Sequence, residues 1–151
     1  MKRSYYIEVP AIPIAQPRPR AVIRGNHAGV APAKKEHPIH AFKATVAMAY
    51  SAHQSKMATH DRAPHTGPVQ ITLKFLFPRT TAMTWKSRPM PRIKYTKKKN
   101  DFDNVAKAVC DALNGVAWVD DGQIYRAQVE RWYCNGDEAP HVEMTIIMED
   151  E

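Results

Sequence analysis

The amino-acid sequence predicts an α+β fold, a single domain in which two main helices accompany a mixed sheet. Three observations predict this class. A chain of 151 residues has the usual length of one domain that buries its own core, so we expect one domain over residues 1–151. Several short segments alternate apolar and polar residues, which is typical of half-buried strands. Two longer segments carry apolar residues at helical spacing instead.

The first third of the chain predicts one strand, one basic loop and one helix. Tyr5–Val9 alternates as a strand does, but closely spaced prolines follow it and prevent regular strand pairing. We therefore expect a basic loop over about residues 10–36, with a turn at Arg24–Asn26. Residues 40–57 predict a helix because three apolar side chains recur on one side at a spacing of four. These side chains are Phe42, Val46 and Tyr50.

The middle and the end of the chain predict three further strands. Residues 69–77 alternate strictly until Pro78 ends the pattern. A second basic loop is expected over residues 79–99, which contain eight Lys and Arg and no acid. The last two strands are expected at 124–133 and 142–148. The Asn-Gly pair between them predicts that they form a hairpin.

The charge is divided unevenly along the chain. Residues 1–100 contain 19 Lys and Arg but three acids, whereas residues 101–151 contain three Lys and Arg and twelve acids. A basic balance indicates a polyanionic partner, most often nucleic acid. Acids within such a protein are explained by a divalent cation that bridges carboxylates and phosphate. The alternative is that the two signs only neutralise each other at the surface.

Residues 97–124 contain the chemistry-bearing motif. Asp101 and Asp103 are two apart, which places both side chains on one face of an extended chain. Asp103 or Asn104 is expected to cap a helix that ends at about Asn114 and is closed by a glycine. One side of this helix is apolar, and the opposite side is polar and includes Lys107, one turn beyond Asp103. The expected apolar stripe is Val105, Ala108, Val109 and Ala112.

The expected lengths of the helix and of the strand after it predict that a second acidic pair lies near the first. The helix carries the chain about 15 Å away at ~1.5 Å per residue. A short strand at 116–119 then returns it by about 13–20 Å at ~3.3 Å per residue. Asp120 and Asp121 therefore come near the level of Asp101 and Asp103, beside Lys107, with one of the second pair facing them. Oxygen ligands of this kind suit Mg²⁺ or Mn²⁺.

Each part of this constellation also has an ordinary structural explanation. The Asp-x-Asp pair taken alone is more simply a helix cap beside a surface acid. Lys107 is well placed for an ion pair with Asp111 one turn later. The combination is more specific than its parts, because the lysine run at 97–99 stands directly before the acids.

The motif resembles that of the RusA family of Holliday-junction endonucleases. The similarity covers about 28 residues without a gap: DFDN at 101–104, Lys107, DALNG at 111–115 and DDGQ at 120–123. The Pro-Arg-Pro-Arg segment at 17–20 further resembles the basic N-terminal segment of phage-type members. The order of strands and helices also fits this family.

The resemblance implies a homodimeric, Mg²⁺-dependent resolvase, with Mn²⁺ as a substitute. It implies Asp101, Asp103 and Asp121 as catalytic metal ligands and Lys107 as a catalytic lysine. Asn104, Asp111 and Asp120 match motif positions with a supporting or structural role. Cationic side chains that flank the motif are expected to bind the DNA backbone. They are Arg18, Arg20, Lys97, Lys98 and Lys99.

The expected function is paired, symmetric cleavage of four-way junctions in DNA recombination and repair. One alternative is a broader nuclease for flaps, forks and other branched DNA. Others are a non-catalytic DNA-binding protein of the same fold, and a structural protein whose acids neutralise its own basic half. No apolar signal segment follows the N-terminus, so we expect a cytoplasmic protein of a bacterium or a phage-infected bacterial cell, without a membrane partner.

Overall fold

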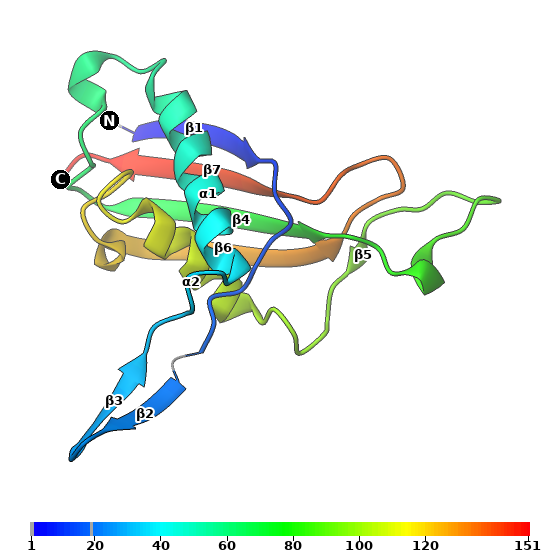
Figure 1. Ribbon diagram of the computed structural model, residues 1–151. Coiled ribbons are helices and arrows are strands. Elements are labelled where there is room, and N and C mark those ends of the chain that lie inside the picture. Colours follow the sequence, from blue (N-terminus) through cyan, green and yellow to red (C-terminus); the bar gives the residue numbers. More distant parts are fainter. Residues whose placement is uncertain (1, 19) are drawn as a thin grey trace.

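The computed structural model describes residues 2–18 and 20–151, and it confirms the α+β class (Figure 1). Two helices, α1 (Pro38–Gln54) and α2 (Phe102–Leu113), lie on one face of a five-stranded mixed sheet. The sheet strands are β1 (Lys2–Val9), β4 (Val69–Phe77), β5 (Ile93–Lys94), β6 (Ile124–Tyr133) and β7 (His141–Glu149). A separate hairpin consists of β2 (Arg20–Arg24) and β3 (His27–Ala31). Short 3₁₀ turns occupy Thr59–Asp61, Thr81–Met83 and Asp121–Gln123.

The strand order determines where the acidic motif lies. The order is β1-β7-β4-β6-β5, with β4 and β6 parallel and the other neighbouring pairs antiparallel. Parallel neighbours need a long crossover connection, and here α2 lies within that connection. The crossover carries Asp101 and Asp103 into α2, and it brings Asp120 and Asp121 to the start of β6.

The core lies between the helices and the covered face of the sheet. Along β7 buried and half-buried residues alternate strictly, as expected for a strand with one covered face. The predicted face of α1 is buried: Ile39, Phe42, Val46 and Tyr50. In α2 the buried stripe is Val105, Ala108, Val109 and Leu113. Leu113 thus takes the place predicted for Ala112, which is half-buried.

The predicted hairpin between the last two strands is wrong. β4 lies between β6 and β7 and pairs with both. A two-residue hairpin turn of the Asn-Gly type requires positive φ, and Asn135 and Gly136 both have negative φ. Residues 134–140 instead span two strand spacings, about 10 Å, and the amide of Cys134 donates to the carbonyl of Phe77 on the intervening strand.

Three further segments differ from the sequence prediction. Residues 116–119 form a compact turn, closed by a hydrogen bond from Gly115 N–H to the Trp118 carbonyl, and not a strand. The loop at 10–36 contains the β2–β3 hairpin, which turns at Gly25 and projects from the body (Figure 1). The loop at 79–99 contains a 3₁₀ turn and β5. None of the described helices combines the length and hydropathy needed to cross a membrane.

Candidate active site

The first aspartate of the motif stands at the junction between an irregular turn and α2. Asn100 has a left-handed backbone with φ of 56°, and the helix begins at Phe102 with Asp101 as its N-cap residue. The predicted cap at Asp103 or Asn104 is therefore wrong. Because the helix starts between Asp101 and Asp103, the spacing of two does not place them on one face as it would in a strand.

Asp101 does not cap the helix with its side chain, because both carboxylate oxygens have other partners. Oδ1 accepts a hydrogen bond from Asn104 Nδ2 at 2.9 Å, and Oδ2 accepts one from Arg18 Nη2 at 3.1 Å. The Asn104 amide, followed by the Arg18 guanidinium, lowers the pKa of Asp101 below its usual value, against the opposing effect of desolvation. Asp101 is thereby held as an oriented carboxylate, and Asn104 is its positioning residue.

Asp103 and Lys107 lie one helical turn apart and face solvent. Among the described residues Asp103 has no hydrogen bond or ion pair, so its carboxylate is available. Lys107 Nζ lies 3.9 Å from Asp111 Oδ2, which confirms the ion pair expected from the spacing. The same oxygen lies 3.7 Å from Lys43 Nζ of α1. Asp111 thus links the two helices in addition to pairing with Lys107.

The second acidic pair has two separate roles. Asp120 Oδ2 accepts from the amide of Gly122, and the Gln123 side chain accepts from the amides of Val119 and Asp120, which forms a capping box. Gln123 also donates to the carbonyls of His65 and Gly67. Asp120 and Gln123 therefore build the turn. The Asp-x-x-Gln spacing is a sequence signal that identifies this role.

Asp121 returns to the neighbourhood of α2. Burial, followed by the nearby carboxylates of Asp121 and Asp111, raises the pKa of the Cys110 thiol to about 12, while Lys107 opposes the shift. Cys110 is three residues beyond Lys107 and seven beyond Asp103, which places the three side chains on one helical face. The Asp121 carboxylate therefore lies near Cys110, in the second half of α2.

The predicted metal ligands do not form one close group. Among the described residues, one group of three candidate ligands has its ligand atoms all within 4.8 Å of one another: Glu8, His141 and Glu143. Asp101, Asp103 and Asp121 do not form such a group. At the Glu8 group, Arg92 Nη2 bonds Glu143 at 2.8 Å, so a cation already neutralises it.

The predicted DNA contacts lie beside this site. Lys97, Lys98 and Lys99 are exposed, while their backbone is fixed by Arg131, which donates to the carbonyls of Lys97 and Asn100. Arg18 contacts Asp101 directly. Arg20 begins β2, and its side chain lies outside the described part of the structure.

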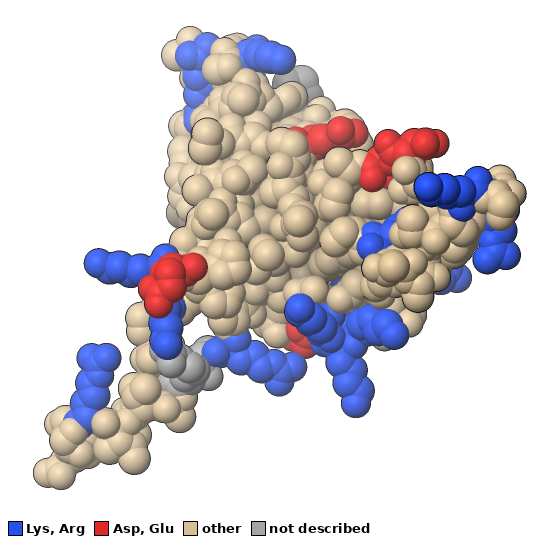
Figure 2. All heavy atoms as spheres, turned by 45° about the vertical axis from the view of Figure 1, so that its right-hand side comes forward, with Lys and Arg blue, Asp and Glu red and all other residues tan. Residues whose placement is uncertain are grey.

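Basic side chains extend along the edge of the molecule on which the β2–β3 hairpin projects (Figure 2). Sequence reasoning missed Arg131, whose bracing role has no local pattern. The aromatic partner of its guanidinium is Tyr95, whose ring centroid is 5.2 Å away.

Comparison with known proteins identifies the lineage of this site. Residues 10–147 match the family described as Endodeoxyribonuclease RusA. The chain belongs to the RusA endodeoxyribonuclease family. A relative is the uncharacterized protein YqaN of Bacillus subtilis (strain 168), which is 32% identical over 150 residues, with 89% of each chain covered. The matched range includes every predicted RusA site residue, and the family description makes the chemistry that of a DNA nuclease.

Proposed function

We propose that this RusA-family protein is a Mg²⁺-dependent endonuclease that resolves Holliday junctions by paired, symmetric cleavage. The observation that carries the proposal is the start of α2, where Asp103 and Lys107 face solvent one turn apart, directly after the oriented carboxylate of Asp101. Solvent-accessible carboxylates near the exposed lysines at 97–99 suit a reaction at phosphate, in which negative charge must be neutralised.

The chemistry of the side chains fits a hard divalent cation held by Asp101, Asp103 and Asp121. All the donors are carboxylate oxygens, which Mg²⁺ and Mn²⁺ prefer. Asp103 is unpartnered among the described residues, and the Arg18 side chain that contacts Asp101 is 81% exposed, so this contact exchanges readily. A bound cation would activate water and stabilise charge on the phosphoryl oxygens.

The side chains of the chain itself have defined roles in this proposal. Asn104 orients the Asp101 carboxylate through its hydrogen bond of 2.9 Å. Lys107 donates to a phosphoryl oxygen as negative charge develops. Water attacks phosphorus directly and loses a proton to solvent, and the bond to the leaving oxygen breaks as that oxygen takes up a proton from solvent. Cys110 is no rival nucleophile, because its raised pKa of about 12 keeps it a thiol.

Two coordinated nicks require two sites. A four-way junction has near two-fold symmetry, and a symmetric homodimer supplies two equivalent sites by geometry. We therefore propose that the active form is a homodimer. Arg18, Arg20 and the lysines at 97–99 would contact the phosphate backbone of the junction in each protomer.

A nicking assay with Asp103→Asn tests the proposal. Wild type and variant are compared on a synthetic four-way junction in Mg²⁺, with linear duplex and flap controls. We expect paired symmetric nicks on the junction and at least about a 100-fold loss of rate in the variant, since a metal ligand contributes several kcal/mol to the transition state. Junction binding should be retained or strengthened, because one negative charge near phosphate is removed.

The matched control is Asp137→Asn, the same change in an exposed turn remote from α2. It should cut at the wild-type rate. Equal cutting of flaps, forks and junctions would favour the broader branched-DNA nuclease instead. Binding without any nicking in Mg²⁺ or Mn²⁺ would favour a DNA-binding protein that retains only the fold.

A further inference from the structure

The outer edge of β6 is free over most of its length. The strand has 10 residues, but β5 has 2 and pairs only with Trp132 and Tyr133. Among the described residues no strand pairs with the outer edge from Tyr125 to Glu130, and residues 125–128 are exposed (Figure 1). Unpaired backbone amides and carbonyls along such an edge are a template for a further strand.

One contact shows which backbone groups this edge offers. The amide of Tyr95 donates to the carbonyl of Arg131 at 3.1 Å, so Arg131 directs its backbone groups to the outer edge. Because successive residues of a strand direct these groups to opposite sides, Ala127 and Val129 also direct theirs outward. The Val129 side chain packs against the core beneath the helices, so the side chains of the even-numbered residues lie on the uncovered face of the sheet.

Two side chains of opposite charge stand on this uncovered face without an ion pair. Among the described residues Arg126 has neither a hydrogen bond nor an ion pair. Glu130 accepts from Gln128 Nε2 at 2.8 Å and from Trp132 Nε1 at 3.1 Å, and these hydrogen bonds lower its pKa against the opposing effect of desolvation. Glu130 is thus an oriented carboxylate that forms no ion pair within the described part of the chain.

Arg126 and Glu130 are placed symmetrically about Gln128. If a second copy of β6 runs antiparallel beside the first with a two-fold axis at Gln128, Arg126 of each copy lies opposite Glu130 of the other. Ala127 then lies opposite Val129 of the second copy, and the two exchange hydrogen bonds, as the outward direction of their backbone groups requires. Moving the axis by one residue, to Ala127, would place Arg126 opposite the neutral Gln128 instead.

The opposite edge of the sheet, β1, is less suited to such pairing. Its cationic side chains already have partners, because Lys2 pairs with Glu149 at 2.8 Å and Arg3 pairs with Asp61. The charges on β1 are therefore compensated within the protein, whereas those of β6 remain for a second copy.

We propose that β6 pairs with β6 of a second copy over Arg126–Glu130, which joins two five-stranded sheets into one continuous sheet. The ladder ends at Glu130 because Tyr95 occupies the next outward carbonyl. Directly opposite residues of antiparallel strands share a face, so α2 of both copies lies on the same side of the joined sheet. Both candidate sites then face one junction, and this use of the interface rests on the proposed function.

Sedimentation velocity without DNA tests the pairing through charge reversal. Arg126→Glu and Glu130→Arg each place like charges opposite each other twice in a symmetric dimer, and we expect the dissociation constant to rise at least about tenfold. An equimolar mixture of the two variants should dimerise as wild type does, because each copy then meets the opposite charge. Recovery in the mixture also shows that both variants fold. Arg24→Glu, the same reversal in the exposed hairpin, is the control and should leave the dimer intact.

A disulfide tests the register directly. In a non-hydrogen-bonded antiparallel pair the two Cα atoms are about 4.5 Å apart, within the range of a disulfide. Gln128→Cys should therefore form a covalent dimer on mild oxidation. Wild type should not, since its two cysteines are half-buried and buried. Ser4→Cys, at an exposed position of β1, is the matched control and should form no covalent dimer.

Two results would overturn the inference. One is a wild type that stays monomeric at micromolar concentration. The other is a dimer that both single reversals leave intact and that is cross-linked through Ser4→Cys and not through Gln128→Cys. Because neither measurement uses DNA, a dimer with this register that nicks no junction would contradict the proposed function alone.

Discussion

The two segments of this protein with a strong excess of basic over acidic residues, 10–36 and 79–99, have opposite structural roles. In residues 79–99 the three arginine side chains contact other groups of the protein itself. Arg79 donates to the carbonyls of Met83, Pro91 and Cys134. Arg92 pairs with Glu138 and Glu143. Two guanidinium groups flank the ring of Trp85, those of Arg79 at 4.7 Å and Arg88 at 4.3 Å.

The hairpin arm formed by β2 and β3 contrasts with this. Most of its described side chains are exposed, and even Ile23 is 82% exposed. Among the described residues the segment 10–36 forms one ion pair, Arg18 with Asp101. The difference teaches that a count of Lys and Arg overstates the charge that 79–99 offers to DNA. The free cations in that segment include the lysines at 97–99, beside the acidic motif.

Among the changes in the two basic segments, Arg79→Met should have the largest effect on folding. The variant leaves three backbone carbonyls without a donor, and we expect a loss of about 2–3 kcal/mol in the free energy of unfolding. At ~2–4 °C per kcal/mol for a domain of this size, the melting temperature should fall clearly. Urea denaturation measures the loss in the free energy of unfolding. The matched control Arg88→Met removes only a ring contact and should cost less than about 1 kcal/mol; equal losses would mean that Arg79 does not brace the segment.

Arg92→Leu should have an intermediate and pH-dependent effect. The pKa of Glu138 is lowered, chiefly by its hydrogen bonds from Arg92. Burial opposes the shift of the Glu143 pKa, but hydrogen bonds from His141 and Arg92 outweigh it, so that this pKa is lowered too. Both carboxyl groups have an ordinary pKa of 4.5. A lowered folded-state pKa contributes stability above the unfolded value and loses it as the pH falls through the folded value.

We therefore expect Arg92→Leu to cost about 1–2 kcal/mol at pH 7, with the difference from wild type shrinking below about pH 4. Urea denaturation across the pH range is the measurement. Arg24→Leu, at an exposed position of β2, serves as the control and should change stability by less than about 0.5 kcal/mol. A pH-independent difference would show that the ion pairs are not its source.

Replacing Lys97, Lys98 and Lys99 by Ala should leave folding nearly unchanged, because the side chains are exposed and Arg131 holds their backbone. Junction binding should weaken, and the slope of log K against log salt should fall by about 2–3, since each phosphate that a lysine neutralises contributes ~0.9. Fluorescence anisotropy at several salt concentrations measures the slope. An unchanged slope would remove these lysines from the interface.

Ile23→Ser should have the smallest effect on stability. The side chain is almost fully exposed, so we expect a change of less than about 0.5 kcal/mol. Ile146→Ala in the buried row of β7 is the contrasting variant and should cost about 2–5 kcal/mol. Both are compared by urea denaturation. A large loss in Ile23→Ser would mean that the arm packs against something in solution and is not a free segment.

The sequence by itself determined the parts of the molecule that depend on local periodicity and on local motifs. Strand β4, the buried face of α1 and the closure of α2 at Gly115, where φ is 76°, follow from patterns over a few residues. The acidic motif could be recognised from the sequence as well. The ion pair of Lys107 with Asp111 could be predicted because the two residues are one helical turn apart.

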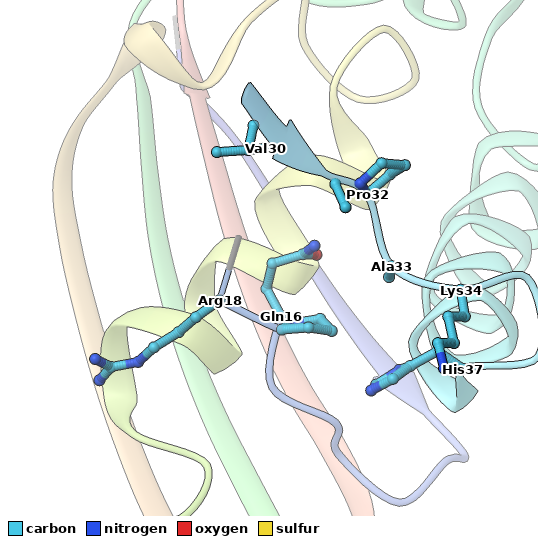
Figure 3. Close-up of a pocket in the computed structure, with 9 residues that line it drawn as sticks. Gln16, Arg18, Val30, Pro32, Ala33, Lys34 and His37 are labelled. Atoms are coloured by element: carbon cyan, nitrogen blue, oxygen red, sulfur yellow. The ribbon is translucent and has the colours of Figure 1, made fainter. Parts of the chain in front are cut away.

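Only the tertiary structure decided which segments meet. The Asn-Gly turn predicted a hairpin, yet β4 is inserted between β6 and β7, since pairing both edges of a buried central strand outweighs a local turn preference. The partners of Asp101 are Asn104, three residues away, and Arg18, 83 residues earlier. Likewise the segments on either side of the arm come together around a cavity of about 570 Å³ (Figure 3). Such contacts depend on loop closure and packing across the chain, which no local pattern encodes.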